Sequence, residues 1–396
     1  MTLPPLPVIR LKPKTDARRL RFGHPWVYDN ELVLDRRTKA LAPGTIAQLE
    51  DSERRALGVI GFNAASRIAG RVLARDADTQ IDAAWIAGKL TAALRLRDTL
   101  YDAPYYRLTH AEGDGLPGVV IDRFGDYAVL QPNAAWADTM REAFADALAA
   151  LGMPNVIMNG TGRARGLEGL AEDRVVLRGT APAGPLPVTM NGATYMADLM
   201  GGQKTGLFYD QRPNHAFAQR FAPGARVLDV FSHVGGFGLA ALAHGAAHVT
   251  CVDGSAPALE LAQAGADAMG QGAALTALKG DAFDIIADLP PASFELVICD
   301  PPAFAPAKPA LEAGLRAYEK VAKMAAPLVA PGGVLGLCSC SHAADLDRFR
   351  KASLRGIGRA GREAQLLYTG FAGPDHPQHP ALAETGYLKA IFLRLA

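Results

Sequence analysis

The amino-acid sequence predicts an α/β protein that begins with a small β-rich domain and ends in a parallel, doubly wound sheet. From about residue 188 onward, short apolar segments alternate with helical segments, which is typical of a parallel sheet with helices on both faces. The first 75 residues contain only short strand-like segments separated by turn residues. The stretch between these regions has the mixed pattern of a small α+β domain. We therefore expect three domains, at 1–75, 76–187 and 188–396.

Strands are expected in the N-terminal domain at 7–11, 45–50, 56–62 and 68–73. This domain also carries the positive charge of the chain. Residues 1–75 hold 14 Lys and Arg against 7 Asp and Glu, a net charge of +7, whereas 76–188 carry −5 and 189–396 carry −1. A basic segment on a nearly neutral body suggests an anionic partner.

Basic and aromatic residues alternate between the first two of these strands. The residues concerned are Arg18, Arg19, Arg21, Trp26 and Tyr28. Because cations bind phosphates and aromatic rings stack on bases, this pattern favours a nucleic-acid-binding surface. The alternative is that the two rings belong to the core and the arginines coat a helix.

The central domain is expected to contain two long helices and several strands. Helices are predicted at 81–100 and 136–151, with strands at 119–122, 127–131, 155–158 and 174–177. Glycine and proline make residues 113–118 a loop, and the same residue types mark the domain boundary at 181–187.

The C-terminal domain is expected to contain five parallel strands. They are predicted at 226–231, 248–252, 274–278, 295–299 and 334–338, with helices at 238–243 and 256–268 among the connections. Ligands of such sheets bind beyond the carboxyl ends of the strands, so candidate functional residues are sought there.

An acidic residue stands at the end of four successive predicted strands. These residues are Asp229, Asp253, Asp281 and Asp300. Asp often caps the following helix, so each one alone is a weak signal, but four at one sheet edge indicate a nucleotide-like ligand. A carboxylate at the position of Asp253 can accept both hydroxyls of a ribose. The first strand is followed by a glycine turn that lacks the GxGxxG pattern, which argues against a nicotinamide dehydrogenase.

The run D-V-F-S-H-V-G-G-F at 229–237, together with the later acids and D-P-P at 300–302, resembles the class I S-adenosylmethionine-dependent methyltransferases. The resemblance implies a Rossmann-like sheet with S-adenosylmethionine as the cofactor. It places the methionine part by the first strand, the ribose at Asp253, and the adenine by Asp281 and Phe283. The cofactor-binding residues implied are Phe208, Asp210, Arg212, Asp229, Ser232, Gly235, Gly236, Asp253, Ser255, Asp281, Ala282, Phe283, Asp300 and Pro301.

A second set of motifs narrows the resemblance to one subgroup. The segment 204–212 is similar to the K-T-G-x-x-x-D-Q-R signature of the large-subunit ribosomal RNA cytosine-5 methyltransferases, which carry an N-terminal PUA domain. Further similar segments are H-P-W-V at 24–27, G-D-G-L-P-G-V-V-I-D-R-F-G at 113–125, C-S-C-S-H at 338–342 and G-Y-L-K at 386–389. The resemblance implies large-subunit ribosomal RNA as the partner, bound in part by Arg18, Arg19, Arg21 and Lys204. It leaves homodimer formation open.

Carbon 5 of cytosine is a poor nucleophile, and a thiolate that adds to carbon 6 activates it. In the resembling family the nucleophile lies at the position of Cys340, and Asp300 could hydrogen-bond ring nitrogen 3. We expect Cys338 to be a buried structural residue. Many related enzymes have a second cysteine after the proline of this loop, whereas this chain has Ala303. The base that removes the carbon 5 proton is therefore not identified.

Two other functions stay open from the sequence. D-P-P followed by A-F resembles the loop of enzymes that methylate a base nitrogen, and the chain could also be an RNA-binding protein without catalytic activity. His376 and His379 lie in an extended proline-containing loop without further ligands, so no metal site is expected.

The composition is that of a folded, ordinary globular protein. The chain has 396 residues, of which 49% are hydrophobic and 20% charged, which excludes wholesale disorder. None of the four cysteines forms a CxxC pair, so the sequence indicates neither a zinc ribbon nor a disulfide scaffold. No apolar run reaches the roughly 18 residues of a membrane span or resembles a signal peptide. We expect a cytoplasmic protein with no membrane partner.

Overall fold

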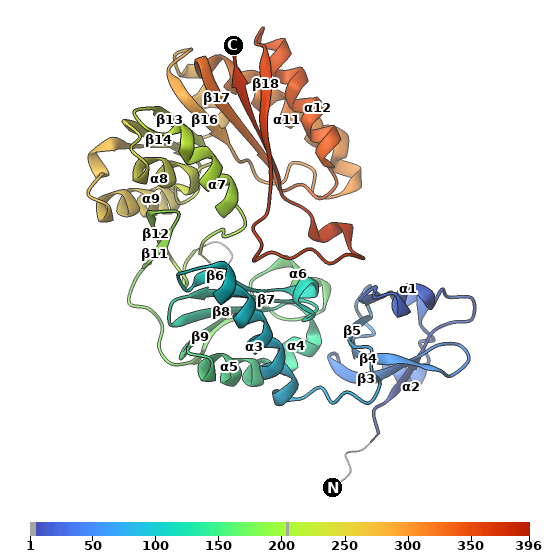
Figure 1. Ribbon diagram of the computed structural model, residues 1–396. Helices are drawn as coiled ribbons and strands as arrows, with labels where there is room; N and C mark the ends of the chain where they lie inside the picture. The colour runs from blue at the N-terminus through green and yellow to red at the C-terminus, as the bar shows by residue number, and fades with distance from the viewer. Residues whose placement is uncertain (1–4, 203–205) are drawn as a thin grey trace. The chain divides into compact units, whose positions relative to one another are not determined.

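The computed structural model describes residues 5–202 and 206–396, so the predicted RNA-binding residue Lys204 lies outside the described residues. The chain forms two compact units (Figure 1). The N-terminal unit comprises Met1–Pro182 and Asp375–Thr385, and the C-terminal unit comprises Ala183–Pro374 and Gly386–Ala396. The division into three domains at 1–75, 76–187 and 188–396 stays a prediction, because contacts alone group the first two segments together.

The first part of the N-terminal unit is a five-stranded sheet with the order β1-β3-β4-β5-β2. Its strands are β1 (Val8–Arg10), β2 (Trp26–Val27), β3 (Thr45–Glu50), β4 (Ala56–Phe62) and β5 (Gly70–Ala74), and its short helices are α1 (Arg18–Arg21) and α2 (Arg36–Lys39). Apolar side chains that alternate along β1, β3 and β4, such as Ile9, Leu49 and Phe62, form the core. The two strands predicted at 45–50 and 56–62 are confirmed with these bounds.

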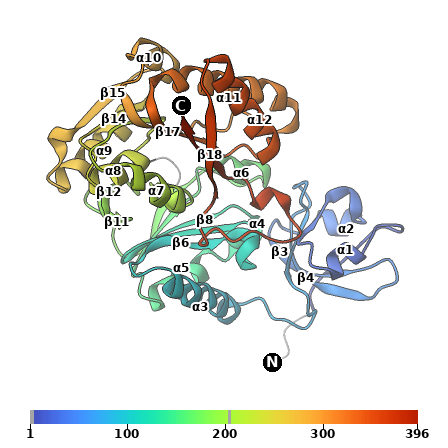
Figure 2. The same ribbon diagram turned by 45° about the horizontal axis from the view of Figure 1, so that its top comes forward.

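The second part of the N-terminal unit is a sheet with the order β10-β9-β8-β7-β6. Its strands are β6 (Tyr105–His110), β7 (Val119–Phe124), β8 (Tyr127–Pro132), β9 (Asn155–Asn159) and β10 (Arg174–Arg178). The helices are α3 (Ala83–Leu100), α4 (Ala135–Thr139), α5 (Arg141–Ala150) and α6 (Arg163–Leu167). Figure 2 shows α3 and α5 on one face of this sheet, where Leu90 and Phe144 belong to a shared core. The helix predicted at 136–151 is wrong as a single element, since the backbone leaves the helical conformation at Met140.

The C-terminal unit contains a seven-stranded sheet with the order β15-β14-β13-β16-β17-β19-β18. Its strands are β13 (Arg226–Val230), β14 (His248–Asp253), β15 (Leu275–Lys279), β16 (Phe294–Cys299), β17 (Val329–Ser339), β18 (Ala364–Phe371) and β19 (Lys389–Leu395). A hairpin of β11 (Leu186–Met190) and β12 (Ala193–Ala197) precedes them. The helices are α7 (Arg212–Ala218), α8 (Gly236–Ala243), α9 (Ala256–Ala268), α10 (Ala282–Asp288), α11 (Leu311–Ala325) and α12 (Leu346–Arg359).

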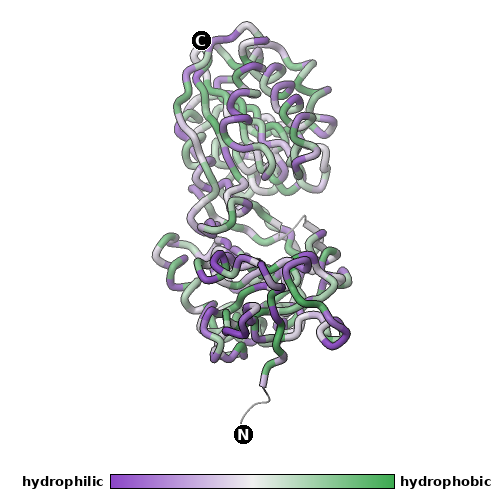
Figure 3. Tube along the Cα trace, turned by 90° about the vertical axis from the view of Figure 1, so that its right-hand side faces the viewer, coloured by the Kyte–Doolittle hydropathy of each residue, from purple (hydrophilic) through white to green (hydrophobic). Residues whose placement is uncertain are grey.

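The five strands predicted to be parallel are confirmed, but the sheet as a whole is mixed. β19 runs antiparallel to both β17 and β18. The sequence pattern missed these two strands because no crossover helix separates them, and a parallel connection requires one. Figure 3 colours the Cα trace by hydropathy and shows hydrophobic and hydrophilic stretches following one another along the chain. Helices α10, α11 and α12 share one hydrophobic core with the sheet.

Candidate cofactor and catalytic site

The loop between β13 and α8 has an unusual backbone. Phe231 and His233 adopt positive φ angles of 62° and 50°, and Gly235 has a φ of 79°. Non-glycine residues in this region store strain, which concentrates at functional sites. Buried Ser232 anchors the loop, since its backbone N–H donates to the carbonyl of Val252 at 3.0 Å. The loop therefore holds one fixed shape at the carboxyl end of the sheet.

Glycines allow helix α8 to begin close to its neighbours. A Cβ atom on Gly236 would lie 3.0 Å from Nε2 of His215, and one on Gly235 would lie 3.1 Å from Cβ of Ala262. Gly238 is equally restricted, because its Cβ would lie 2.9 Å from Sγ of Cys251. Gly235 and Gly236 were predicted site residues, whereas Gly238 of the same G-G-F-G run was not.

Asp229 is a buried carboxylate with an unused acceptor atom. Its Oδ2 accepts a hydrogen bond from the N–H of Gly238 at 2.8 Å, and its Oδ1 is buried with no partner among the described residues. Burial, with a smaller contribution from the nearby carboxylates of Asp300 and Asp253, raises the pKa of Asp229 to about 7. Three carboxylates that repel one another form a place where a cationic ligand is favoured.

Asp253 is oriented by two backbone amides. Its Oδ2 accepts from the N–H of His233 and its Oδ1 from the N–H of Ser255, both at 2.8 Å. Ser255 caps α9 by accepting from the N–H of Ala258. Each carboxylate oxygen keeps a second lone pair, so Asp253 can accept from two ligand hydroxyls.

Asp281 is the N-cap of α10. The sequence allowed this structural role as the alternative to ligand binding. Its Oδ1 accepts from the N–H of Phe283 at 2.8 Å and from that of Asp284 at 3.4 Å. Ala282 is buried in the core. The ring of Phe283 lies 6.2 Å from that of Phe231, and Nζ of Lys320 lies 4.4 Å from its centroid. The adenine-binding role of these residues stays a prediction.

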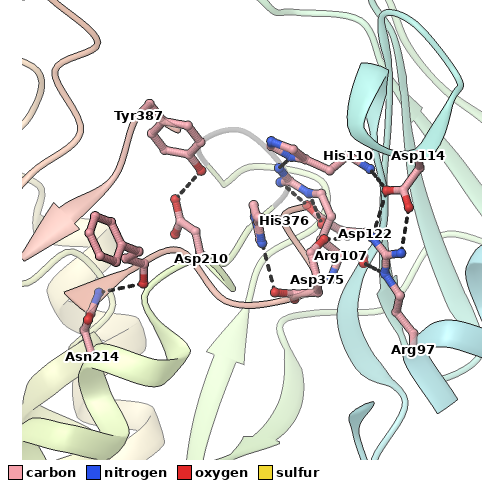
Figure 4. A network of polar contacts seen from close by, with 11 residues as sticks. Arg97, Arg107, His110, Asp114, Asp122, Asp210, Asn214, Asp375, His376 and Tyr387 are labelled. Atoms are coloured by element: carbon pink, nitrogen blue, oxygen red, sulfur yellow. Dashed lines mark hydrogen bonds and ion pairs between the residues drawn. The ribbon is translucent and has the colours of Figure 1, made fainter. Parts of the chain in front are cut away.

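The D-Q-R segment reaches the same sheet edge. The ring of Phe208 packs edge-on against that of His233 at 5.0 Å, and the guanidinium of Arg212 lies 5.5 Å from the ring centroid of Tyr209. The side chain of Asp210 accepts from the hydroxyl of Tyr387 at 2.6 Å, as Figure 4 shows. This hydrogen bond links the D-Q-R segment to the residues directly before β19.

Asp300 follows β16 and is held in place by Gln211. The amide of Gln211 donates to Oδ2 of Asp300 at 2.8 Å, while its Oε1 accepts from Asn214 at 2.6 Å. Asn214 also donates to the carbonyl of Phe371 at 3.3 Å (Figure 4). Pro301 is buried beside Asp300. Gln211 was not among the predicted site residues, although it is the central residue of the D-Q-R motif.

The four cysteines differ in exposure. Cys251, Cys299 and Cys338 are buried, and burial raises the pKa of each thiol. Cys340 is partly exposed and follows directly after β17. Cys340 is therefore the cysteine of this sheet edge that solvent can reach.

The strand end that carries Cys340 is tied to two other segments. The hydroxyl of Tyr318 in α11 accepts from Oγ of Ser339 at 2.9 Å and lies 2.6 Å from Oγ of Ser341. Oγ of Ser341 also accepts from the N–H of Ala305 at 2.8 Å. Nothing in the sequence pattern pointed to Tyr318, because it lies on the buried face of an amphipathic helix.

The three arginines predicted to bind RNA, Arg18, Arg19 and Arg21, lie in α1 of the N-terminal unit. Arg19 forms an ion pair with Glu31, and Arg21 forms one with Asp51 at 2.7 Å. Arg18 is exposed, and Phe22, directly after the helix, is 83% exposed. Phe22 was missed because its exposure, unlike its residue type, depends on the fold.

The indole of Trp26 forms a hydrogen bond within the N-terminal unit. Its Nε1 donates to Oε1 of Glu112 at 2.8 Å, and Arg71 forms ion pairs with Glu112 and with Glu168. Trp26 therefore belongs to the packing of the N-terminal unit, as the alternative interpretation of the basic segment proposed.

His376 lies within the N-terminal unit, with its Nδ1 2.9 Å from Oδ1 of Asp375 (Figure 4). Across residues 5–202 and 206–396, no group of three or more His, Cys, Asp and Glu side chains is placed to hold a metal ion. No helix in the same described ranges has the length and apolar character needed to cross a membrane.

Comparison with known proteins agrees with this geometry. Residues 9–75 match a family described as a PUA-like domain, and residues 177–394 match one described as S-adenosylmethionine-dependent methyltransferase. A ribosomal RNA large subunit methyltransferase of Deinococcus radiodurans is 34% identical, with 98% of each chain covered. Ribosomal RNA large subunit methyltransferase I of Aeromonas salmonicida is 33% identical over 96% of this chain and 98% of its own length. The chain belongs to this methyltransferase family.

A solved structure shares the fold of this methyltransferase. SMU.776, whose structure is described as a methyltransferase complexed with SAH, covers 98% of this chain and 99% of its own, with a TM-score of 0.80 and 19% identity. S-adenosylmethionine is the cofactor of the methyltransferase family. The site fits it, since the unused buried Oδ1 of Asp229 and the neighbouring carboxylates suit a ligand that carries a sulfonium and an ammonium group.

Proposed function

We propose that this methyltransferase transfers a methyl group to carbon 5 of a cytosine in large-subunit ribosomal RNA. The observation that carries the proposal is the position of Cys340. It is the one partly exposed cysteine of the chain, and it follows a strand that ends at the same sheet edge as Asp229 and Asp253. The relatives named as ribosomal RNA large subunit methyltransferases support the substrate class, and on the same ground we propose that the protein acts in the cytoplasm.

The proposed reaction uses Cys340 as the attacking group. The thiolate forms a bond to carbon 6, and the electron pair of the carbon 5–carbon 6 double bond moves so that carbon 5 can accept a methyl group. S-adenosylmethionine, when bound, supplies this methyl group from a sulfonium. A base then removes the proton from carbon 5, the double bond re-forms, and the thiolate leaves.

Asp300 is proposed to contact ring nitrogen 3 of the target base. The hydrogen bond from Gln211 at 2.8 Å orients its carboxyl group toward this contact. The target cytosine has to be unstacked, because carbon 6 cannot be reached inside a helix.

The N-terminal unit is proposed to bind RNA through the surface around α1. Exposed Arg18 can approach a phosphate, and exposed Phe22 can stack on an unpaired base. Arg19 and Arg21 add positive charge there, although part of it is balanced by Glu31 and Asp51.

The decisive experiment uses RNA that contains 5-fluorocytosine, whose fluorine cannot be removed as a proton. The wild-type enzyme should form a stable methylated protein–RNA adduct, and peptide mapping should locate it on Cys340. An adduct on Cys338 would overturn the assignment. An N-methylated nucleoside in the product would instead favour the residues 300–304 as an amino-methylation loop, and failure to bind S-adenosylmethionine would favour an inactive RNA-binding protein.

A further inference from the structure

Lys389 is a lysine buried inside the C-terminal sheet. It is 4% exposed and is paired with Ser339 in the register of β17 and β19. Its Nζ donates to the carbonyl of Ser341 at 2.6 Å and to that of Tyr387 at 3.0 Å. The first of these acceptors belongs to the residue directly after Cys340, so Lys389 holds the chain at the nucleophile.

The charge of Lys389 has no carboxylate partner. Both acceptors of its hydrogen bonds are neutral carbonyl oxygens, and in the described part of the chain no carboxylate lies within ion-pair distance of it. Burial lowers the pKa of Lys389 to about 8, against the attraction of Cys340 and Asp345. Burying a cation without a counter-ion is costly, and an apolar side chain would serve the packing better.

We propose that Lys389 is a positioning residue that holds the Cys340–Ser341 turn and acts as the counter-ion of the Cys340 thiolate. This role rests on the proposed function, since only a nucleophilic Cys340 needs an ionised sulfur. The thiol loses its proton to solvent, while the ammonium keeps its three protons and its two carbonyl acceptors. The negative charge on sulfur then supplies the counter-ion that the buried ammonium lacks.

The other titratable groups near this pair do not replace Lys389. Tyr318 of α11 faces Cys340, and burial raises the pKa of its phenol, so it is neutral at physiological pH. Asp345, the exposed N-cap of α12, is the acid that acts on Lys389, and Asp300 is a like charge for a thiolate at this edge. Lys389 is thus the cation whose ammonium group is bonded to the residue directly after Cys340.

The test measures alkylation of the folded full-length chain by iodoacetamide as a function of pH. Because the other three cysteines are buried, the reaction reports Cys340, and Cys340→Ser provides the background. In the wild type, the midpoint of the profile should lie below the value of about 8.5 for a free cysteine. A wild-type midpoint at or above that value would overturn the proposal without the use of any variant.

Substitutions at Lys389 and Tyr318 distinguish the effect of the positive charge of Lys389 from the effect of holding the Cys340–Ser341 turn in position. Lys389→Met should move the midpoint up by about one pH unit and slow alkylation at pH 7 about tenfold, and Lys389→Arg should restore much of the shift. Tyr318→Phe is the control, because it loosens the same turn without removing a positive charge and should leave the midpoint unchanged. An unchanged midpoint in folded Lys389→Met, or an equal shift in Tyr318→Phe, would contradict the counter-ion role.

A negative result for the Lys389 proposal can be distinguished from a negative result for the proposed methyl transfer through Cys340. Alkylation requires neither RNA nor cofactor, so the Lys389 result stands even if a Cys340→Ser enzyme still methylates RNA. Binding of S-adenosylmethionine should be the same in Lys389→Met and in the wild type, measured by calorimetry. Loss of that binding would identify Lys389 as part of the fold of the cofactor site and overturn the specific role.

Discussion

Buried charges are arranged in opposite ways in two regions of this methyltransferase. In the N-terminal unit, the guanidinium of fully buried Arg97 forms two hydrogen bonds to the carboxylate of Asp114, and it also donates to the carbonyls of Arg107 and Asp375 (Figure 4). At the carboxyl edge of the C-terminal sheet, Asp229 and Asp253 form no ion pair with any described residue, and Lys389 is bonded only to neutral carbonyls.

The ion pair of Arg97 and Asp114 stabilises the fold. The unpaired charges at the sheet edge are suited instead to binding a ligand or taking part in a reaction. A buried ion pair whose hydrogen bonds are all made specifies one packing arrangement, and removing one partner is strongly destabilising. Buried like charges destabilise the free protein and become favourable when a cation arrives. We therefore expect substitutions at Arg97 to affect stability, and substitutions at the sheet edge to affect binding and turnover.

Cys340→Ser should have the largest effect. The hydroxyl keeps the shape of the site but is a far weaker nucleophile, so turnover should fall by about three orders of magnitude or more. The melting temperature and cofactor affinity should be close to those of the wild type. Cys338→Ser is the matched control and should retain most activity. Methylation assays on RNA would contradict the assignment if Cys340→Ser turned over at the wild-type rate.

Arg97→Met should lower the free energy of unfolding by about 3–5 kcal/mol, because it leaves Asp114 as a buried carboxylate without its cation. Urea denaturation measures this loss. An exposed arginine of the same unit, Arg178→Met, removes surface ion pairs and should cost less than about 1 kcal/mol. Equal losses in the two variants would show that the burial of the pair has no special importance.

Asp253→Ala should weaken S-adenosylmethionine binding by about 2–3 kcal/mol, since two ribose hydroxyls lose a charged acceptor. Calorimetry on the folded variant measures the change. Ser255→Ala, which removes only the cap of α9, is the control and should affect cofactor affinity much less. Unchanged affinity in Asp253→Ala would remove the ribose-binding assignment.

Asp229 should make the stability of the cofactor-free protein depend on pH. Its pKa is about 7 in the folded protein and 3.8 for an ordinary Asp, so the folded state binds more protons between these values. Stability therefore falls as pH rises from about 4 to about 7. Asp229→Asn should flatten this decrease in thermal unfolding scans without cofactor. An identical decrease in the variant would show that other groups cause it.

Phe22→Ala should have the smallest effect, a loss of RNA affinity of about 1–3 kcal/mol from one stacked base. Fluorescence anisotropy with single-stranded RNA measures it, and cofactor affinity should not change. Arg18→Gln should instead reduce the salt dependence of RNA binding. If neither variant changes RNA binding, the surface around α1 is only a solvated face.

Much of the site could be predicted because it depends on short stretches of sequence. The acids at strand ends and the glycine turn before α8 follow local rules of strand, turn and helix formation, so Asp229, Asp253 and Gly235 could be proposed as site residues from the sequence alone. The strands β18 and β19 were missed, because the antiparallel pairing of β19 with both β17 and β18 is a long-range choice that no local pattern encodes.

The sequence by itself determined the five parallel strands of the C-terminal sheet, the positions of the acidic strand ends and the presence of the family motifs. Only the tertiary structure decided which cysteine is exposed, that Gln211 orients Asp300, and that Lys389 reaches the residue after Cys340. The partners in these last two contacts are 89 and 48 positions apart along the chain. Burial and hydrogen bonding between such distant residues exist only once the sheet has formed, because the packing of its strands creates the environment that sets their charge and reactivity.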